Sequence, residues 1–543
     1  MKRNVFLSTM LAACLTLSLA PTAFAEEAAA PDLRPRTLVT TDLECDDIDS
    51  MLPLLLYSND IDIAGIVVSA STHHWTGDGE HRMEEVIDSF QKGGELTEWR
   101  PMELDWLYNL YENEYAEAYE NLVKHDSSYP SPEDLAAVTK IGNVEFEGDY
   151  RFDTEGSDYI KELLLDDDER TLYVQAWGGA NSLARALYSL EETYKDTEEW
   201  DAIYDKVTKK AILVSWGDQD NTYADYMSVN WPDLRHLYCV TSGIGYGTSR
   251  NCTVPYRFYF MPEWLTENIK FDHGSLMGKY LLYGDGIYYE GETPDNQFGD
   301  LEVANDPTSW LRMFTPDGFE QYEFISEGDS PCWMMLIPVG LRGLEDYSYG
   351  SWGGRLGEDG HGIPEYDPTI GYADAGFGVG AYGVWRWFPA FMNDWAARAD
   401  WCVSEYADAN HQPVVSADVL DFEAAPGETV ELAASAEDPD GNDLAMNWYV
   451  YSAACSYSGA YLADLDVWAH GTATTSFTVP QDAADGDYFN LVFEATDNGE
   501  PALTRYAQAI VKVVAPAEEA AAEEAPAEEA VAEEAPAEET AAE

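Results

Sequence analysis

The sequence predicts an α/β domain, with a mostly parallel sheet and helices on both faces, followed by an all-β domain. From residue 36 onward, short apolar runs alternate with segments of helical periodicity. Four of these runs end in polar or Gly-rich turns, which indicates a single site at one edge of the sheet. Near Asn410, short alternating runs separated by Asp, Gly and Pro turns replace this pattern.

The first strand and helix carry the most informative motif. An apolar, β-branched run over residues 38–41 stops at Asp42, Asp46 and Asp47 follow, and residues 51–56 begin an apolar helix. A strand that delivers carboxylates into the turn before a helix places them at the carboxyl end of a sheet, where α/β proteins bind ligands. Converging carboxylates favour a hard cation, Ca²⁺ or Mg²⁺. For the motif alone, simple capping of the helix remains the alternative.

The elements that follow extend this pattern to the same predicted edge. We expect strands over 61–70, 171–177 and 211–216, and helices over 80–91, 103–124 and 384–405. The strand ends carry His73-His74-Trp75, Trp177-Gly-Gly-Ala-Asn181 and Trp216-Gly-Asp-Gln-Asp220. Indole rings at a polar rim, here Trp177, Trp216 and Trp352, suit stacking on carbohydrate, although each ring alone is also typical of a core.

The last third of the chain has the pattern of an immunoglobulin-like β-sandwich, predicted for residues 409–514. Strands are expected at 429–433, 445–450, 475–479, 488–493 and 508–514. The acidic segment 437–443 is either a plain surface turn or a Ca²⁺ site. Residues 515–543 repeat Ala, Glu and Pro, cannot form a packed core, and are predicted to be a disordered tail.

The start of the chain predicts export. A basic start, an apolar run and Ala23-Phe-Ala25 form a secretory signal peptide over residues 1–25, followed by an acidic lead over 26–35. Cys14 offers a lipoprotein site as the second reading. No other apolar run is long enough to cross a bilayer. The mature protein is therefore expected to be secreted: periplasmic, extracellular or at the cell surface.

Charge and cysteine content exclude several classes. The net charge is −73, from 29 basic and 102 acidic residues, which disfavours nucleic acid or an anionic membrane as partner. Six cysteines follow the signal without a zinc-ligand spacing, and Cys239–Cys252 is the expected disulfide because it closes a short loop. Cys45 lies beside acidic residues that raise a thiol pKa, so it is a poor nucleophile.

These motifs together resemble a known family over residues 36–514. The set comprises Val39-Thr-Thr-Asp42 with Asp46-Asp47, Ser69-Ala-Ser-Thr-His-His-Trp75, Trp177-Gly-Gly-Ala-Asn181, Glu327-Gly-Asp-Ser-Pro331 and Trp352-Gly-Gly-Arg355. It is similar to the amino-terminal motif of nucleoside hydrolases, and more closely to a secreted, cellulose-binding, nucleoside hydrolase-like branch. That branch joins this domain to a C-terminal sandwich.

The resemblance implies one Ca²⁺ and a set of roles. Asp42 would be metal ligand and general base, with Asp47, Asp329 and the carbonyl of Ala180 as further ligands. Hydroxyl-contacting or substrate-binding positions would be Asp46, His74, Trp75, Trp177 and Asn181. The metal would lower the pKa of bound water, and attack would resemble that of inverting glycosidases.

The sequence departs from that family at three places. Thr40 replaces the first Asp of the motif DxDPGxDD, Leu43-Glu44 replaces its Pro-Gly, and Gly328 replaces a His that protonates a purine leaving group. Glu44 either adds a ligand or faces solvent, and His73 or His74 would have to act as the acid. Two functions are therefore predicted: a secreted Ca²⁺-dependent hydrolase of a glycosidic, N-glycosyl bond, or a non-catalytic protein that binds cellulose or another polysaccharide. The expected partner is a carbohydrate or nucleoside-like small molecule, cellulose included, and the oligomeric state is not predicted.

Overall fold

The computed structural model describes residues 32–102, 104–240, 243–288, 292–313, 315–367, 372–373, 380–460 and 469–514. The predicted signal peptide, most of the acidic lead and the predicted tail lie outside these residues. All elements described here fall between residues 34 and 514.

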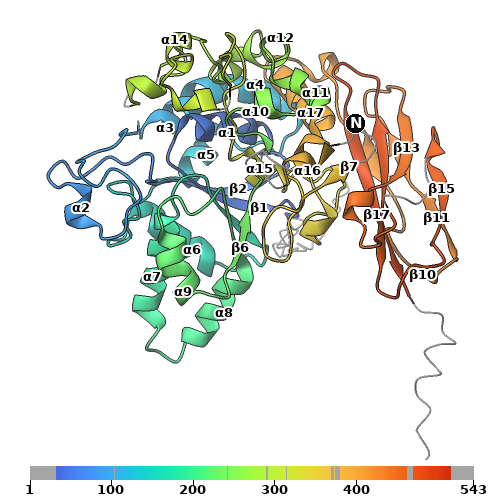
Figure 1. The fold of residues 1–543 in the computed structure, drawn as a ribbon, viewed down its shortest axis with the longest axis horizontal. Helices are drawn as coiled ribbons and strands as arrows, with labels where there is room; N and C mark the ends of the chain where they lie inside the picture. Colours follow the sequence, from blue (N-terminus) through green and yellow to red (C-terminus); the bar gives the residue numbers. More distant parts are fainter. Residues whose placement is uncertain are drawn as a thin grey trace, which may run out of the picture. The chain divides into compact units, whose positions relative to one another are not determined.

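A six-stranded parallel sheet forms the centre of the first domain (Figure 1). Its strand order is β3-β2-β1-β4-β5-β6, and every neighbouring pair is parallel. The predicted α/β fold is confirmed; β3 and β6 were not predicted because they are short and their flanks lack clear periodicity. The strands are β1 (Arg36–Thr41), β2 (Asp62–Val68), β3 (Thr139–Ile141), β4 (Leu172–Ala176), β5 (Ala211–Ser215) and β6 (Arg235–Tyr238).

Helices cover both faces of this sheet because neighbouring strand residues point to opposite sides. Leu38 and Val67 pack into one buried cluster with α6, α7 and α8, whereas Val39 and Ile66 pack into another with α1 and α17. In Figure 1, α6, α7 and α8 lie below the sheet. These helices are α1 (Cys45–Leu56), α6 (Glu155–Leu165), α7 (Asn181–Tyr194), α8 (Trp200–Lys210) and α17 (Phe388–Trp401).

Two predicted helices differ from expectation. The helix expected over 80–91 is only α2 (Met83–Val86), because the backbone is already extended at Ile87. Further on, Gly93 adopts a left-handed backbone and lies against Trp75. The segment 103–124 contains α3 (Trp106–Leu110) and α4 (Ala116–His125) joined by a π-helical turn. The remaining short helices are α5 (Pro132–Val138), α9 (Ser228–Asn230), α10 (Thr248–Asn251), α11 (Val254–Arg257), α12 (Pro262–Leu265), α13 (Gly274–Gly278), α14 (Leu301–Ala304), α15 (Ser330–Met334) and α16 (Ala381–Trp385).

The C-terminal domain is all-β, as predicted. A five-stranded sheet of order β10-β17-β16-β13-β14 is accompanied by the antiparallel pairs β11-β15 and β12-β9. The immunoglobulin-like topology and the domain boundaries stay predictions. The elements are β9 (Val414–Ser416), β10 (Asp421–Ala424), β11 (Thr429–Ala433), β12 (Ser435–Glu437), β13 (Ala445–Val450), β14 (Ala469–His470), β15 (Thr474–Thr478), β16 (Tyr488–Thr496) and β17 (Thr504–Val513). The pair β7 (Tyr366–Asp367) and β8 (Tyr372–Ala373) precedes α16 and forms a separate two-stranded sheet.

The two domains share a buried junction. Tyr451 and Tyr506 of the second domain belong to the same apolar cluster as α17 of the first. Arg505 of β17 donates from Nη1 to Oδ2 of Asp394 in α17 at 2.7 Å. β16 and β17 are therefore buried on both faces, which hides the simple alternation typical of a half-exposed strand.

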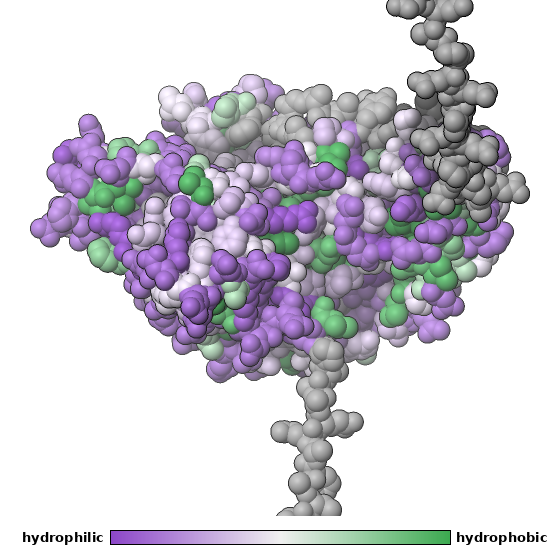
Figure 2. Space-filling model, turned by 90° about the horizontal axis from the view of Figure 1, so that it is seen from below, coloured by the Kyte–Doolittle hydropathy of each residue, from purple (hydrophilic) through white to green (hydrophobic). Residues whose placement is uncertain are grey.

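The outer surface is strongly polar. Figure 2 shows one face of the molecule dominated by hydrophilic side chains, with small scattered apolar areas. Within the described residues, the helices are too short or too polar to span a bilayer.

Candidate active site

The predicted site lies at the carboxyl-end edge of the sheet, called the rim below, at the point where the strand order reverses beside β1. β1 leads through α1 to β2 on one side, whereas β4 lies on its other side, and ligands bind at such a switch point in open α/β sheets. Asp42 follows β1, residues 69–74 follow β2, and Trp177 follows β4. Gly178 must lack a side chain here, since a β-carbon would lie 2.8 Å from Cγ of Asp42.

Asp42 is buried, accepts hydrogen bonds from two donors and lies close to a third nitrogen. The Ser71 hydroxyl donates to Oδ2, the Glu44 N–H donates to Oδ1 at 3.3 Å, and Nδ1 of His74 lies 3.7 Å from Oδ2. Leu43 adopts a left-handed backbone with φ of 56°, which turns the chain sharply between β1 and α1. This strained turn aims Asp42 and the first turn of α1 at the same place.

A second set of carboxylates meets beside Asp42. Asp46, Asp47 and Asp329 each offer an oxygen within 4.8 Å of the others. Asp47 accepts hydrogen bonds from the Thr41 hydroxyl at 2.6 Å and from the Asp42 N–H at 3.2 Å, so its orientation is fixed. Burial, and then the charges of neighbouring carboxylates, raise the pKa of Asp47 and Asp329 well above the usual value and that of Asp46 to about 6.

Glu44 faces the site. It lines the cavity, and its carboxylate forms a second group with Asp42 and His74, again within 4.8 Å. Burial, followed by the charge of Asp46, raises the pKa of Glu44 to about 8. His74 is engaged through Nε2 with Glu292 at 3.2 Å; although burial opposes its charge, Glu292 and Asp42 raise its pKa overall.

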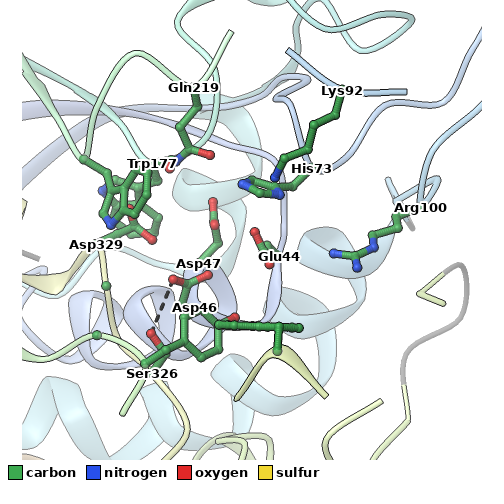
Figure 3. Close-up of a pocket in the computed structure, with 15 residues that line it drawn as sticks. Glu44, Asp46, Asp47, His73, Lys92, Arg100, Trp177, Gln219, Ser326 and Asp329 are labelled. Carbon is green, nitrogen blue, oxygen red and sulfur yellow. Dashed lines mark hydrogen bonds between the residues drawn. The ribbon is translucent and has the colours of Figure 1, made fainter. Parts of the chain in front are cut away.

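A cavity of about 570 Å³ opens over these carboxylates. Trp177 and Trp216 both line it, as predicted for the rim; Trp216 is half-exposed, whereas Trp177 is almost completely buried. Figure 3 shows Asp46, Asp47 and Glu44 near its centre, with Asp329 beside Trp177 and with Lys92 and Arg100 on the opposite side. The lining residues are Glu44, Asp46, Asp47, His73, Lys92, Arg100, Trp177, Trp216, Gln219, Gly245, Tyr246, Trp310, Ser326, Gly328 and Asp329.

A disulfide connects the rim to the segment that carries Asp329. Cys239, just after β6, is bonded to Cys332 in α15, with their Cα atoms 5.2 Å apart. The expected Cys239–Cys252 bridge is wrong, because Cys252 is buried and free. Proximity in sequence favoured Cys252, whereas the fold brings α15 beside the end of β6.

Four other predicted residues lie elsewhere. The Ala180 carbonyl accepts the N–H of Ala184 in α7, and the Asn181 amide donates to the carbonyls of Asn143 and Asp149 rather than lining the cavity. Trp75 packs on Phe146 in a small core, with ring centroids 5.6 Å apart. Trp352 is fully buried and is also absent from the cavity wall.

The two candidate acids have different environments. His73 lines the cavity, and burial and then nearby Lys92 lower its pKa to about 4, so it is neutral at pH 7. His74 is buried and held between Asp42 and Glu292. At Gly328, where the related family has a His, a β-carbon would lie 2.8 Å from Oδ2 of Asp46.

The donor set fits a hard divalent cation. Oδ1 of Asp329 is buried without a hydrogen-bond partner among the described residues. In the same part of the chain, no Lys or Arg forms an ion pair with Asp42, Asp46, Asp47 or Asp329, and His74 is the one base close to Asp42. Carboxylates without compensating charge are suited to Ca²⁺ or Mg²⁺, which prefer oxygen ligands. Glu327, by contrast, accepts from Tyr280 and Ser330 and is already satisfied.

This fold and site define a nucleoside hydrolase-like α/β protein with an appended β domain. The chain belongs to the family described as cellulose-binding Sde182, nucleoside hydrolase-like domain, whose model matches residues 36–356. Residues 429–513 match the C-terminal domain of cellulose-binding protein Sde0182. A comparison with curated proteins found no match.

One solved structure supports the fold. A nucleoside hydrolase-related protein from Saccharophagus degradans, described as associated with carbohydrate metabolism, is 23% identical with a TM-score of 0.61; the match covers 88% of this chain and all of that one. A plant nucleoside hydrolase is 12% identical with a TM-score of 0.29, over 57% of this chain and 80% of that one. The second similarity is too low to support an inference.

Proposed function

We propose that this protein is a secreted, Ca²⁺-dependent hydrolase of a glycosidic bond, N-glycosyl by family resemblance. The observation that carries the proposal is the convergence of Asp46, Asp47 and Asp329 within 4.8 Å, beside buried Asp42, under a cavity with indole walls. Holding these charges together costs stability, so a cation that balances them has a reason to bind.

Asp42, Asp47 and Asp329 are the proposed cation ligands. A bound Ca²⁺ would supply Lewis acidity, lowering the pKa of a water molecule in the cavity. Asp42 accepts the proton from that water, since its orientation is fixed by hydrogen bonds from the Ser71 hydroxyl and the Glu44 N–H. Asp46 lies next to the Ser326 hydroxyl, at 3.4 Å, and accepts a hydrogen bond from a sugar hydroxyl.

The aromatic walls hold the sugar or its leaving group. Trp216 keeps 46% of its surface exposed inside a cleft, which suits stacking on a ring with an apolar face. Trp177 is almost completely buried and donates from Nε1 to Gln175 at 2.9 Å, so it forms a fixed part of the cavity wall. The carbonyl of Ala180 remains a proposed metal ligand, and Asn181 a proposed substrate-binding residue.

Turnover by matched variants tests this proposal. The full chain is incubated with Ca²⁺ and a panel of nucleosides and glycosides, and product release is compared for the natural protein, Asp42→Asn and Asp167→Asn. Asp167 is fully exposed and serves as the control. Loss of the general base should reduce the rate by at least about 100-fold, whereas the control keeps it. Equal turnover by Asp42→Asn would rule out the proposed role of Asp42.

A non-catalytic polysaccharide-binding protein is the second candidate. It is favoured by Gly328, which removes the acid for a purine leaving group, and by the cellulose-binding family of the C-terminal domain. Its signature is retention on insoluble cellulose without release of sugar or base from any substrate in the panel. Retention that survives Asp42→Asn, with no turnover by the natural protein, selects this candidate.

A further inference from the structure

The cavity carries positive charge on the side opposite its carboxylates. Lys92 and Arg100 both line it, in a chain with only 29 basic residues against 102 acidic ones. In Figure 3 their side chains approach from one side, while Asp46 and Asp47 rise from the first turn of α1. Neither cation forms an ion pair with Asp42, Asp46, Asp47 or Asp329 within the described residues, so balancing that cluster does not account for them.

Lys92 is held at the cavity by a buried carboxylate. Glu147, fully buried, accepts the backbone N–H of Gln91 at 2.7 Å and that of Lys92 at 3.4 Å. The Gln91 side chain also donates to the Asp218 carbonyl at 2.8 Å, which ties this loop to the end of β5. The Lys92 ammonium has no hydrogen bond or ion pair with any described residue, and Glu147 is affected by its charge only from a longer distance. A fixed backbone therefore presents an unpaired cation to the cavity.

Arg100 is oriented by backbone strain and by one carboxylate. Its φ is 46°, in the left-handed region that non-glycine residues rarely occupy. The guanidinium lies over the Trp99 ring, 5.0 Å from its centroid, with Nε 3.2 Å from Oε1 of Glu292. Glu292 is shared with His74, so Arg100 keeps donors available for another acceptor. Strain of this kind is stored preferentially at ligand-binding positions.

We propose that this cavity binds a glycoside bearing an anionic group, a carboxylate or a phosphate, which Lys92 and Arg100 receive while the sugar hydroxyls face the carboxylate cluster. The inference rests on the proposed function and names the substrate class of that same site. A neutral sugar would leave the Lys92 ammonium without an ion-pair partner and would leave Arg100 with Glu292 alone. An anion gains charge-assisted hydrogen bonds from each, and a carboxylate or phosphate matches the planar donors of arginine.

Paired ligands that differ only in charge test this inference. With Ca²⁺ present, calorimetric affinities of the full chain are measured for methyl glucoside against methyl glucuronide, and for adenosine against adenosine 5′-monophosphate. The variants are Lys92→Met and, as a matched control, Lys209→Met, whose ammonium is exposed on α8. The first pair reports a carboxylate and the second a phosphate.

The expected result is at least about tenfold tighter binding of the charged member of one pair, the size of one charge-assisted contact. That preference should fall at least about threefold in Lys92→Met, where Arg100 remains, and persist in Lys209→Met. Equal affinities within both pairs, a preference that Lys92→Met leaves unchanged, or no binding of either charged ligand would each overturn the inference. Because the readout is binding alone, these outcomes are separate from loss of turnover in Asp42→Asn, which tests the proposed chemistry.

Discussion

Two clusters of buried carboxylates in this molecule have opposite electrostatics. At the rim, Asp47 and Asp329 are 2% exposed, lie near other acids and have no arginine or lysine partner among the described residues. At the domain junction, Asp394 is fully buried but accepts from Arg398 Nε at 2.9 Å and from Arg505 Nη1 at 2.7 Å. The rim raises carboxylate pKa values, whereas the arginines overcome burial and lower the pKa of Asp394 to about 2.

This difference distinguishes carboxylates that stabilise the fold from carboxylates that are suited to binding a ligand. The junction supplies its own counter-ions, and Tyr57 adds a donor to Asp394 at 2.9 Å, so the cluster is complete without a ligand. The rim places comparable charge in a cavity that a cation and a substrate can enter. Removing one partner of a buried ion pair destabilises the folded protein. Buried carboxylates without counter-ions at a switch point of the sheet instead indicate a functional site.

The largest effect is expected at the junction. Asp394→Asn leaves Arg398 and Arg505 without their shared charge, and should lower the free energy of unfolding by about 3–5 kcal/mol. Urea denaturation of the full chain measures this difference. Asp408→Asn is the control, because Asp408 is exposed. Calcium affinity should stay unchanged. A change below about 1 kcal/mol would show that the junction network is not structural.

The rim should respond to a cation instead. At a Ca²⁺ concentration 100 times its dissociation constant, the natural protein should gain about 2.7 kcal/mol of stability. Asp47→Asn removes one charge from the cluster and should abolish most of that gain, while Asp394→Asn keeps it. Thermal unfolding with and without Ca²⁺, after treatment with a chelator, reports both variants. Equal stabilisation of Asp47→Asn would exclude Asp47 as a ligand.

How far the sequence predicts these regions depends on the range of the contacts. The alternation of strands and helices predicts the sheet, and Asp42, Asp46 and Asp47 follow from one local motif of strand, turn and helix. Trp177 is correctly expected at the cavity for the same reason: it directly follows a strand. These residues lie close in sequence to the elements that position them.

Long-range partners are not encoded in any local pattern. Three residues of the site lie in irregular loops: Lys92, Arg100 and Glu292. The sequence around them has no helical or strand periodicity, and no motif connects them to Asp42. Cys332 pairs with Cys239 across 93 residues, a contact that only the folded sheet creates. Trp75 adjoins the predicted strand end, yet the chain turns it inward onto Phe146. Asp329 is predicted from the family resemblance alone, because a short segment that lies 287 residues after Asp42 gives no geometric signal by itself.

The two clusters should also give opposite dependences of stability on pH. In cation-free protein, the pKa values of Glu44 (about 8) and Asp46 (about 6) are raised, so the folded state binds more protons and stability rises as pH falls from about 8 towards 5. The lowered pKa of Asp394 acts the other way: its contribution, about 2 kcal/mol, is complete above about pH 4 and is lost as pH falls towards 2.

Urea midpoints between pH 8 and pH 2 measure both slopes. Saturating Ca²⁺ should remove the upper slope, since the cation replaces the protons, and Asp394→Asn should flatten the lower one. An upper slope that Ca²⁺ leaves intact would assign it to the general acidity of the chain rather than to the rim.

The smallest effect is expected from neutralising one rim acid. In cation-free protein, Asp329→Asn removes a buried charge that repels Asp42 and Asp46, and an amide retains a similar shape, so stability should rise by about 1 kcal/mol. Asp394→Asn is the same chemical change at the junction and has the opposite sign, because there the lost charge has partners. With Ca²⁺ present, the gain at Asp329 should reverse, as the cation loses a ligand. Urea denaturation of the natural protein and of Asp329→Asn, each in chelator and in Ca²⁺, gives the four free energies of unfolding. If Asp329→Asn is less stable than the natural protein in chelator, this carboxylate is structural.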